Sequence, residues 1–501
     1  MHRMKTKTSI NHKHIVFLTV TALLIMTSCR PHEVIRVVVT PTPNPEAALV
    51  ASATPTTTDT ETSTVTPEPT HTPTETSTPT QTTTAATSAG PTDIPDFGPI
   101  VGPDYVRPTL PPVDTPTPEP DAATATPRVT LDPRSPTIVT TPVPRLNPNE
   151  MGLQLDVNLS FEDFEQAVGD AQTTGVKWIK LQVNWDFLQF EGPNDVEKIA
   201  LFERQVELAS RPEGMRVLLS FAKAPRWTRS VLQEDGPPDD PQELADFITM
   251  LLRDTKVGSA IDAIEIWNEP NLQREWQGTL PFNGAGYMRL FEPSYRAIRA
   301  IYPDMTIVTA GLAPTSNLPG AVDDREFLQQ MYDAGLRNYV NDANLEIGVH
   351  PYGWANDPDA RCCGAANAEP GWDDNPRFFF LENIEAVRSI MVRNDHENAQ
   401  IWVTEFGWPS WHGIGAPAPE AWLTYLTPNQ QADYIIRAFE YAQRTDYIGP
   451  MFLWNLNFAN ETSVERGNEI VAFSIINPTF PVRERPAFWA LGFATGAVAP
   501  Q

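Results

Sequence analysis

Two short stretches decide the fold: residues 264–271, which read IEIWNEPN, and residues 401–408, which read IWVTEFGW. Each stretch is an apolar run that ends on a carboxylate beside aromatic side chains, and such a run predicts a buried β-strand. The first strand would deliver Glu269 at its carboxyl end, and the second would deliver Glu405. Because the carboxyl ends of the strands form one face of a β/α barrel, the two stretches predict a pair of carboxylates on that face.

Apolar runs continue through residues 149–501 and alternate with helical segments. Phe247 and Leu251 recur at helical spacing in one segment, and Thr427 with Gln430 forms a capping box at the start of another. Eight strands alternating with eight helices predict a (β/α)₈ TIM barrel of the α/β class. An open doubly wound sheet would also alternate, but no Gly-rich phosphate-binding fingerprint follows the first strand. The predicted strands are residues 153–157, 178–183, 217–221, 263–267, 306–310, 345–350, 401–405 and 451–455.

Residues 1–28 are typical of a secretory signal peptide. Lys5 and Lys13 precede an apolar run at residues 15–26, and Ser28 and Cys29 follow it. The run is short for a membrane span. A Cys after small residues resembles a bacterial lipoprotein signal, which implies that Cys29 carries lipid and anchors an extracellular, cell-surface protein to a membrane. An ordinary cleaved signal or an uncleaved anchor would also place the rest of the chain outside the cytoplasm.

Residues 29–148 form a Pro- and Thr-rich segment. The chain holds 50 Pro, and about half of them lie before residue 150. Tracts such as residues 115–120 (TPTPEP) cannot bury a core, and they favour extended polyproline II. We therefore expect a disordered, semi-rigid stalk that holds a domain away from a surface. Such tracts can carry O-linked sugars. Disorder without a spacer role is the alternative.

Composition excludes several classes of protein. The chain has 501 residues and a formal net charge of −27, which argues against nucleic acid as a partner. Only 3 Cys are present, too few for a disulfide scaffold. The predicted domain contains His350, His396 and His412, without the spacing of a metal-binding motif. We therefore expect no metal ion and no cofactor.

Polar and aromatic side chains follow several of the predicted strands. Asn268 stands beside Glu269, His350 and Tyr352 follow the sixth strand, and Trp454 follows the eighth. Aromatic rings pack against the apolar face of a sugar, while amides, carboxylates and imidazoles bind its hydroxyl groups. This set of side chains therefore predicts a carbohydrate substrate.

Further Trp side chains are candidate platforms for sugar rings. They are Trp408 after the seventh strand, Trp411 shortly beyond it, and Trp354 after the sixth. Trp is also a frequent core residue, so core packing is the alternative for each of them.

The predicted barrel resembles the glycoside hydrolases of clan A, with families 39 and 5 nearest. Residues 267–270 (WNEP) are similar to the fourth-strand motif of that clan, and residues 404–407 (TEFG) are similar to its seventh-strand motif. The resemblance implies that Glu269 is the acid/base, that Glu405 is the nucleophile, and that Asn268 contacts the sugar 2-hydroxyl.

Two other strand ends extend the resemblance. Residues 350–352 (HPY) resemble the sixth-strand motif, which implies that Tyr352 steadies the nucleophile and that His350 lines the sugar subsite. Trp454 matches the Trp at the floor of that subsite. One departure is Lys180 near the end of the second strand, where family 5 has Arg. Lys keeps the charge but loses the planar fork of a guanidinium, and we place Lys180 with the substrate-binding residues.

The expected reaction is hydrolysis of an O-glycosidic bond with retention of configuration. Glu405 attacks the anomeric carbon while Glu269 donates a proton to the leaving oxygen, and Glu269 then serves as the base for water. We expect the negative charge of Glu405 to raise the pKa of Glu269.

Cys362 and Cys363 are adjacent in the long segment after the sixth strand. In an oxidising compartment they could form a vicinal disulfide beside the cleft. Two reduced thiols or an intermolecular bond are the alternatives, because ordinary disulfide geometry disfavours adjacent partners.

Two other functions remain open. A catalytically weak or inactive carbohydrate-binding lipoprotein could use the same barrel, and the stalk would also suit a surface scaffold or adhesin. Release of reducing sugar would separate an enzyme from both. We expect a monomer. The particular glycan, and internal or terminal cleavage, do not follow from the sequence.

Overall fold

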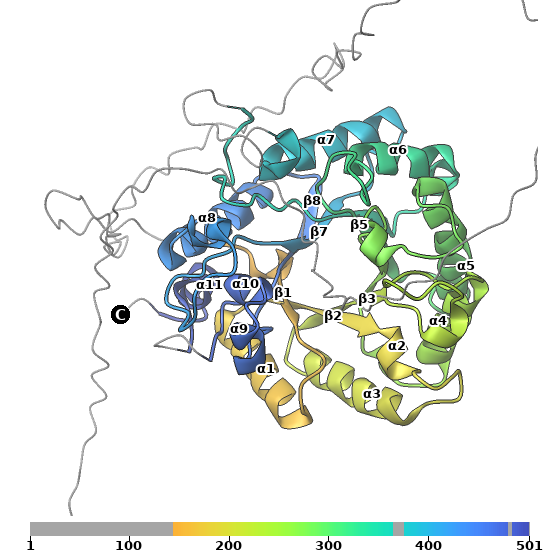
Figure 1. Ribbon diagram of the computed structural model, residues 1–501, viewed down its shortest axis with the longest axis horizontal. Coiled ribbons are helices and arrows are strands. Elements are labelled where there is room, and N and C mark those ends of the chain that lie inside the picture. Colours follow the sequence, from red (N-terminus) through yellow and green to blue (C-terminus); the bar gives the residue numbers. More distant parts are fainter. Residues whose placement is uncertain (1–143, 364–374, 479–482, 500–501) are drawn as a thin grey trace, which may run out of the picture. The chain divides into compact units, whose positions relative to one another are not determined.

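The computed structural model describes residues 144–363, 375–478 and 483–499. Eight parallel strands close into a barrel in the order β1 to β8, and helices surround it (Figure 1). The predicted (β/α)₈ fold is therefore confirmed. The strands are β1 (Met151–Leu155), β2 (Trp178–Asn184), β3 (Arg216–Ala222), β4 (Ala263–Asn268), β5 (Thr306–Gly311), β6 (Leu345–Val349), β7 (Ile401–Phe406) and β8 (Ile448–Leu453).

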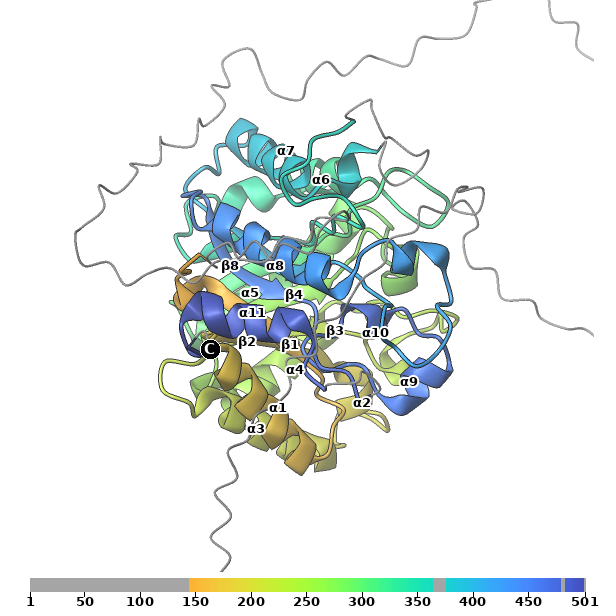
Figure 2. The ribbon, with the colours of Figure 1, turned by 90° about the vertical axis from the view of Figure 1, so that its left-hand side faces the viewer.

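Long helices follow most strands, and α11 packs between α8 and α1 to complete the ring (Figure 2). The α-helices are α1 (Phe161–Thr174), α2 (Trp185–Leu188), α3 (Glu197–Ser210), α4 (Gln242–Arg253), α5 (Gly284–Ile301), α6 (Asp324–Asp333), α7 (Phe380–Arg393), α8 (Pro428–Ala442), α9 (Glu461–Glu465), α10 (Ile470–Phe473) and α11 (Pro486–Thr495). Short 3₁₀ helices are η1 (Pro148–Glu150), η2 (Arg226–Thr228), η3 (Val257–Ser259), η4 (Gln273–Glu275), η5 (Leu336–Tyr339), η6 (Pro376–Phe378) and η7 (Ala421–Thr424).

The eighth strand begins three residues before its predicted start, because it includes Gly449 and Pro450. Both residue types disfavour regular strands, so the sequence pattern hides this part of β8. The structure accommodates them where Ile401 pairs with Ile448 and Val403 pairs with Met451. Two steps along β7 thus match three steps along β8, which is the geometry of a bulge.

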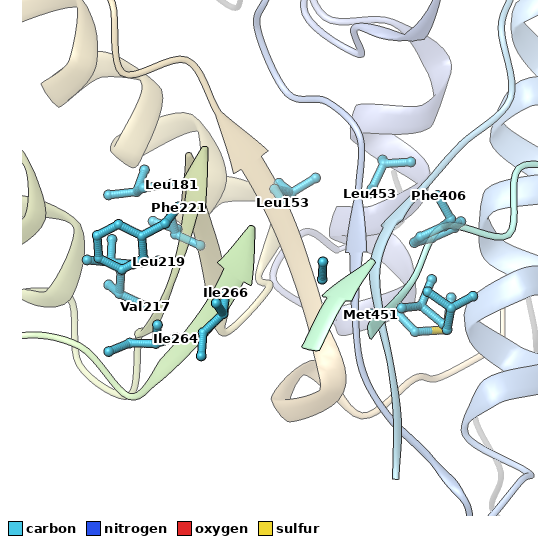
Figure 3. Packing of buried hydrophobic residues seen from close by; sticks show 14 of the residues in the cluster. Leu153, Leu181, Val217, Leu219, Phe221, Ile264, Ile266, Phe406, Met451 and Leu453 are labelled. Atoms are coloured by element: carbon cyan, nitrogen blue, oxygen red, sulfur yellow. The ribbon is translucent and has the colours of Figure 1, made fainter. Parts of the chain in front are cut away.

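Side chains of the strands alternate between two environments, as the period of two in a β-strand requires. On β2, Ile179, Leu181 and Val183 join the large apolar cluster that strands and helices share. Figure 3 shows ten strand residues of this cluster by name, contributed by β1 to β4, β7 and β8. Burial of this cluster holds the helices against the outside of the barrel.

The other face of the strands supplies a separate apolar layer. The layer consists of one residue from each of six strands: Trp178, Leu218, Ala263, Val308, Trp402 and Phe452. The rings of Trp178 and Trp402 meet edge to face, with centroids 5.2 Å apart. Gly152 on β1 makes room for Phe452, since a Cβ at Gly152 would lie 2.5 Å from the Phe452 ring.

Two residues further along the strands, the same inward face becomes polar. Lys180 follows Trp178 at this spacing, Glu265 follows Ala263, and Thr404 follows Trp402. Lys180, Glu265 and Thr404 are fully buried. The sequence thus builds a charged layer on top of an apolar one, and the charged layer lies toward the carboxyl ends of the strands.

The capping box at the start of α8 is present as predicted. The Thr427 hydroxyl accepts from the backbone N–H of Gln430, and the Gln430 side-chain oxygen accepts from the backbone N–H of Thr427. Within the described ranges, no helix combines the length and apolar character needed to span a lipid bilayer. The predicted signal peptide, Cys29 and nearly all of the stalk lie outside the described residues.

Candidate active site

Glu269 and Glu405 lie together at the carboxyl ends of the strands. Glu269 directly follows β4, and Glu405 is the penultimate residue of β7. Both residues are nearly buried, with exposed fractions of 8% and 6%. One carboxylate oxygen of each lies within 4.8 Å of the other and of a ring nitrogen of His350. The two strand ends singled out by the sequence therefore meet at one site.

Two donors fix the orientation of the Glu405 carboxylate. The Lys180 ammonium lies 3.0 Å from Oε1, and the Tyr352 hydroxyl donates to Oε2 at 3.0 Å. Burial raises the pKa of Tyr352 well above its ordinary value, and the Glu405 charge adds to this effect. Tyr352 is therefore held as a neutral donor, which suits the steadying contact that the resemblance implies.

Lys180 binds two carboxylates. Its Nζ lies 3.0 Å from Glu265 and 3.0 Å from Glu405, and its side chain has no exposed surface. In this structure Lys180 contacts Glu405 and not open space, because its inward position on β2 buries the side chain, so a direct contact with substrate stays a prediction. Burial alone would lower the pKa of Lys180, but the charges of Glu265 and Glu405 outweigh burial and raise it.

Glu265 is the partner that balances this charge. It is fully buried, and it accepts a hydrogen bond from the backbone N–H of Gly311 at 3.0 Å. Burial acts to raise the pKa of Glu265, but the Lys180 charge outweighs it, with help from His350, so the pKa is lowered. The Lys180–Glu265 pair is therefore ionised, as a buried pair must be to repay its desolvation.

Glu269 accepts hydrogen bonds on both of its carboxylate oxygens. Oε1 lies 3.0 Å from His350 Nδ1, and Oε2 lies 3.2 Å from Nη2 of Arg274. Burial acts to raise the pKa of Glu269, but the His350 hydrogen bond and the charges of His350 and Arg274 lower it overall. The net direction is thus opposite to the expected raised pKa, because the contacts with His350 and Arg274 outweigh burial.

The backbone around Glu269 is strained. Trp267 has φ of 78° and Glu269 has φ of 40°, both in the left-handed region that favours glycine. Non-glycine residues in this region cost about 1–3 kcal/mol each and occur preferentially at functional sites. The turn that ends β4 therefore stores strain where it delivers the carboxylate.

His350 is completely buried and contacts protein groups through both ring nitrogens. Nδ1 faces Glu269, and Nε2 lies 3.1 Å from the Thr404 hydroxyl. The predicted role of His350 in lining the sugar subsite stays a prediction: with no exposed surface in this structure, its ring contacts Glu269 and approaches Glu405 to 3.9 Å. Gly311 permits this arrangement, since a Cβ there would lie 2.2 Å from His350 Nε2.

Asn268 and Trp454 have free groups at the site. Asn268 is 7% exposed, and its Oδ1 has no hydrogen-bond partner among the described residues. The ring of Trp454 is half-buried and packs against Phe473 and Tyr352, at centroid distances of 5.1 and 6.1 Å. A buried amide oxygen without a partner and a supported indole face are both suited to a bound sugar.

Trp408 does not form a sugar platform. It is 1% exposed, its Nε1 donates to the backbone carbonyl of Asn356, and its ring packs against Phe380 and Tyr434. Trp411 is likewise buried in a small apolar cluster. In this structure both side chains are packed in apolar clusters, which is the core-packing alternative for them.

Trp354 keeps part of its surface exposed and packs against Trp422 and Phe378. Nearby, the structure joins the sulfur atoms of Cys362 and Cys363, and the backbone N–H of Cys362 donates to Glu382 at 3.0 Å. The disulfide stays a prediction until the thiols are titrated, and residues 364–374 of this segment lie outside the description.

Two functional candidates were missed by the sequence interpretation. Glu265 had a detectable signal, because a Glu between Ile264 and Ile266 in a buried strand must face inward beside Lys180. Arg274 had none, since its contact with Glu269 depends on the path of the loop after β4. Arg274 also lies 3.7 Å from Glu275.

Glu269, His350 and Glu405 are close enough to ligate a metal ion. The donor chemistry argues against such a site, because the buried Lys180 already places a positive charge on Glu405 and Arg274 places a second one on Glu269. A divalent cation would have to displace both.

Comparison with known proteins supports the fold. No family model matches the chain, and no curated protein is similar to it in sequence. A family 39 glycoside hydrolase from the gut symbiont Bacteroides cellulosilyticus has a similar structure: it is 19% identical, the match covers 72% of this chain and 67% of that one, and the TM-score is 0.50. This likeness identifies the architecture as the (β/α)₈ barrel that the family 39 enzyme also has.

Two further glycoside hydrolases align over similar lengths with lower scores. A glucosidase from Croceicoccus marinus is 12% identical over 71% of this chain and 68% of its own, with a TM-score of 0.47. The GH53 catalytic domain of Ignisphaera aggregans is 16% identical over 71% of this chain and 98% of its own, also with a TM-score of 0.47.

Proposed function

We propose that the barrel is a glycoside hydrolase that cleaves O-glycosidic bonds with retention of configuration. The observation that carries the proposal is the approach of Glu269 and Glu405, whose carboxylate oxygens come within 4.8 Å of each other. Retaining enzymes hold their two carboxyl groups about 5–5.5 Å apart, whereas inverting enzymes need roughly 6.5–9.5 Å to admit a water. A nearest oxygen–oxygen approach within 4.8 Å is compatible with the shorter of these two separations and so favours a covalent intermediate.

In the first step, a Glu405 oxygen forms a bond to the anomeric carbon as the bond from that carbon to the leaving oxygen breaks. Glu269 gives its proton to the leaving oxygen. In the second step, Glu269 takes a proton from water, and the water oxygen replaces Glu405 on the anomeric carbon. Lys180 and Tyr352 hold Glu405 in a fixed orientation throughout, so little reorganisation is needed at either step.

His350 can support both protonation states of Glu269. When neutral, with its proton on Nδ1, it still donates to Oε1 while Oε2 carries the acidic proton, and Nε2 then accepts from the Thr404 hydroxyl. Burial lowers the pKa of His350, but the charges of Glu405 and Glu269 outweigh burial and raise it. Covalent capture of Glu405 by the sugar removes one of those charges during the reaction.

We also propose that the substrate is an extracellular poly- or oligosaccharide. The unpartnered Oδ1 of Asn268 and the partly exposed indole of Trp454 support a sugar ring between them and the carboxylate pair. The signal-like residues 1–28 and Cys29 support a lipid anchor on the outer side of a bacterial membrane.

The test is hydrolysis of xylan, β-glucan, mannan and aryl glycosides, followed by reducing-sugar release and by liberated phenol. Glu405→Gln should lose activity on every substrate. Glu269→Ala should lose roughly 10²–10⁴-fold on natural glycans but far less on activated aryl glycosides, which need little proton donation. Glu165→Gln, an exposed position on α1, is the matched control. Binding of a glycan without turnover by the wild-type protein would favour the non-catalytic alternative.

A further inference from the structure

A cavity lined by Arg274, a residue that contacts Glu269, is not used by the steps above. It has a volume of about 380 Å³ and is lined by Glu234, Leu272, Gln273, Arg274, Gln277 and Gly320. These residues come from the loops that follow β3, β4 and β5, so the cavity opens at the carboxyl end of the barrel. Its volume falls within the range of about 300–1,000 Å³ that is usual for ligand sites. We name it the Arg274 cavity.

Arg274 connects this cavity to the catalytic carboxylate. Its guanidinium lies 3.2 Å from Glu269 and 3.7 Å from Glu275, and its side chain is 64% exposed. The side chains of Glu269 and Glu275 are only 11% and 18% exposed. Only the Arg274 side of this ion pair is exposed, so the guanidinium can turn from Glu269 into solvent without a new burial cost.

The resting arrangement conflicts with the proposed chemistry. Both oxygens of Glu269 are occupied, Oε1 by His350 and Oε2 by Arg274. A general acid must present a proton to the leaving oxygen from one of these atoms. Oε2 can carry a proton while it accepts from Arg274, but the guanidinium charge favours the ionised form of Glu269. His350 is buried and cannot withdraw, so Arg274 is the group whose movement would favour the proton.

Glu275 offers Arg274 a second position. Burial raises the pKa of Glu275 to about 7, and the nearby negative charge of Glu269 adds to this. A guanidinium that turned from Glu269 toward Glu275 would favour the ionised form of Glu275 and remove a positive charge from Glu269. Both changes favour a proton on Glu269 and not on Glu275.

Resting on the glycosidase function proposed above, we propose that the Arg274 cavity binds a neutral sugar as the leaving group and that Arg274 is a positioning residue for Glu269. With the cavity empty, Arg274 covers Oε2. A sugar in the cavity takes the guanidinium as a donor to its hydroxyl groups, which uncovers Oε2 for proton transfer. The negative charges of Glu275 and Glu469 balance the charge of Arg274, and this favours a neutral sugar over an acidic one.

This coupling gives Arg274 a role in the pH profile. The groups that face Glu269 are His350 and Tyr352 after β6, Glu405 on β7, and Arg274 with Glu275 on the loop after β4. Glu469, just before α10, also acts on Arg274, and Lys223 and Asp235 after β3 act on Glu275. Among these, Arg274 is the cation that a variant can remove without opening the buried layer. Its loss should make Glu269 easier to protonate in the free enzyme, because an opposite charge nearby is gone.

The experiment compares wild-type protein with Arg274→Gln, Arg274→Lys and the control Arg296→Gln, whose side chain on α5 is 72% exposed. The probes are a nitrophenyl glycoside and the cello-, xylo- or manno-oligosaccharide of the same glycone that the wild-type protein hydrolyses fastest. For each pair we would measure kcat, KM and the pH dependence of kcat/KM.

Arg274→Gln should move the basic limb of the oligosaccharide profile, which depends on protonated Glu269, upward by on the order of one pH unit. It should raise KM for the oligosaccharide several-fold more than KM for the nitrophenyl glycoside, and Arg274→Lys should restore part of both effects. An unshifted basic limb, or an equal change in KM for the two probes, would overturn the inference while leaving the glycosidase in place. Absence of wild-type turnover on every probe would instead overturn the proposed function, and this inference with it.

Discussion

At the scale of single residues, Lys180 shows how a buried charge can be retained. The ammonium has no exposed surface and lies 3.0 Å from both Glu265 and Glu405. Desolvation of one cation and two carboxylates is costly, and mutual attraction offsets it only while all three are present. The same contact fixes the orientation of the Glu405 carboxylate. The stability of the barrel and the orientation of Glu405 therefore both depend on Lys180.

Lys180→Met should therefore destabilise the barrel by about 3–5 kcal/mol, because it leaves Glu265 and Glu405 buried without a cation. Urea denaturation at neutral pH measures this loss. The control is Lys256→Met, whose side chain is 68% exposed and which should unfold much like the wild-type protein. If Lys180→Met and Lys256→Met unfold at the same urea concentration, the buried triad does not have the assigned role.

Sequence reasoning was most successful for side chains fixed by the strands themselves. Glu269, Glu405 and Tyr352 follow from strand position, and the structure brings them together. Reasoning was least successful where a residue type has two common environments, as for Trp408, or where a loop determines the contact, as for Arg274. A strand sets the direction of its side chains by its period, whereas a loop brings no such constraint.

At the scale of elements, the eight strands were predictable because each is an apolar run of the length and composition of a buried strand. The start of β8 was not, since Gly449 and Pro450 lie in it at a register shift against β7. Helix starts with a side-chain cap, such as Thr427 before α8, were predictable from the capping residue and its partner three positions later.

Glu346 on β6 leads to a prediction about how the stability of the fold depends on pH. Burial raises the pKa of Glu346 to about 7, from 4.5 in the absence of the fold. The fold thus favours the uncharged carboxyl, and its stabilising contribution is complete below pH 4.5 and is lost as the pH rises through 7. The Glu346→Gln variant has no carboxyl to ionise at this position. Its free energy of unfolding relative to wild type should therefore increase by about 1–3 kcal/mol between acid and alkaline pH.

Urea denaturation of Glu346→Gln and wild type at pH values below and above this range supplies the comparison, with Glu165→Gln on the exposed face of α1 as the control. A stability difference that stays constant with pH would show that Glu346 titrates normally in the folded protein.

The segment after β6 carries a second prediction at this scale. Cys362 and Cys363 follow Arg361, which forms an ion pair with Glu385 on α7. The backbone N–H of Cys362 donates a hydrogen bond to Glu382 on the same helix. Replacing both Cys with Ser should raise KM for oligosaccharides roughly 2- to 10-fold through lost preorganisation, with little change in the unfolding midpoint. Two titratable thiols in protein purified without reductant, or unchanged KM, would count against it.

At the scale of the whole molecule, composition divides the chain at about residue 148. The Pro- and Thr-rich part cannot supply an apolar core, whereas the barrel buries one between its strands and helices. This contrast was readable from the sequence because it depends on composition alone. The particular glycan was not, because specificity depends on loops at the carboxyl ends of the strands.

The amino-terminal part leads to a prediction about anchoring. We expect the mature protein to begin at Cys29 with attached lipid, and Cys29→Ala to leave the precursor unprocessed or to shed the protein from the membrane fraction. Mass spectrometry of the protein extracted from membranes distinguishes these forms. An intact leader, or an unmodified amino terminus elsewhere, would contradict the lipoprotein interpretation.

The retaining mechanism of the Glu269–Glu405 pair is tested most directly by the configuration of the first-formed product. Proton NMR of the anomeric signals should be recorded during hydrolysis of the fastest substrate, before mutarotation equilibrates them. The carboxylate spacing predicts that the initial product keeps the anomeric configuration of the substrate. Initial appearance of the opposite anomer would contradict the double displacement and the role of Glu405 as nucleophile.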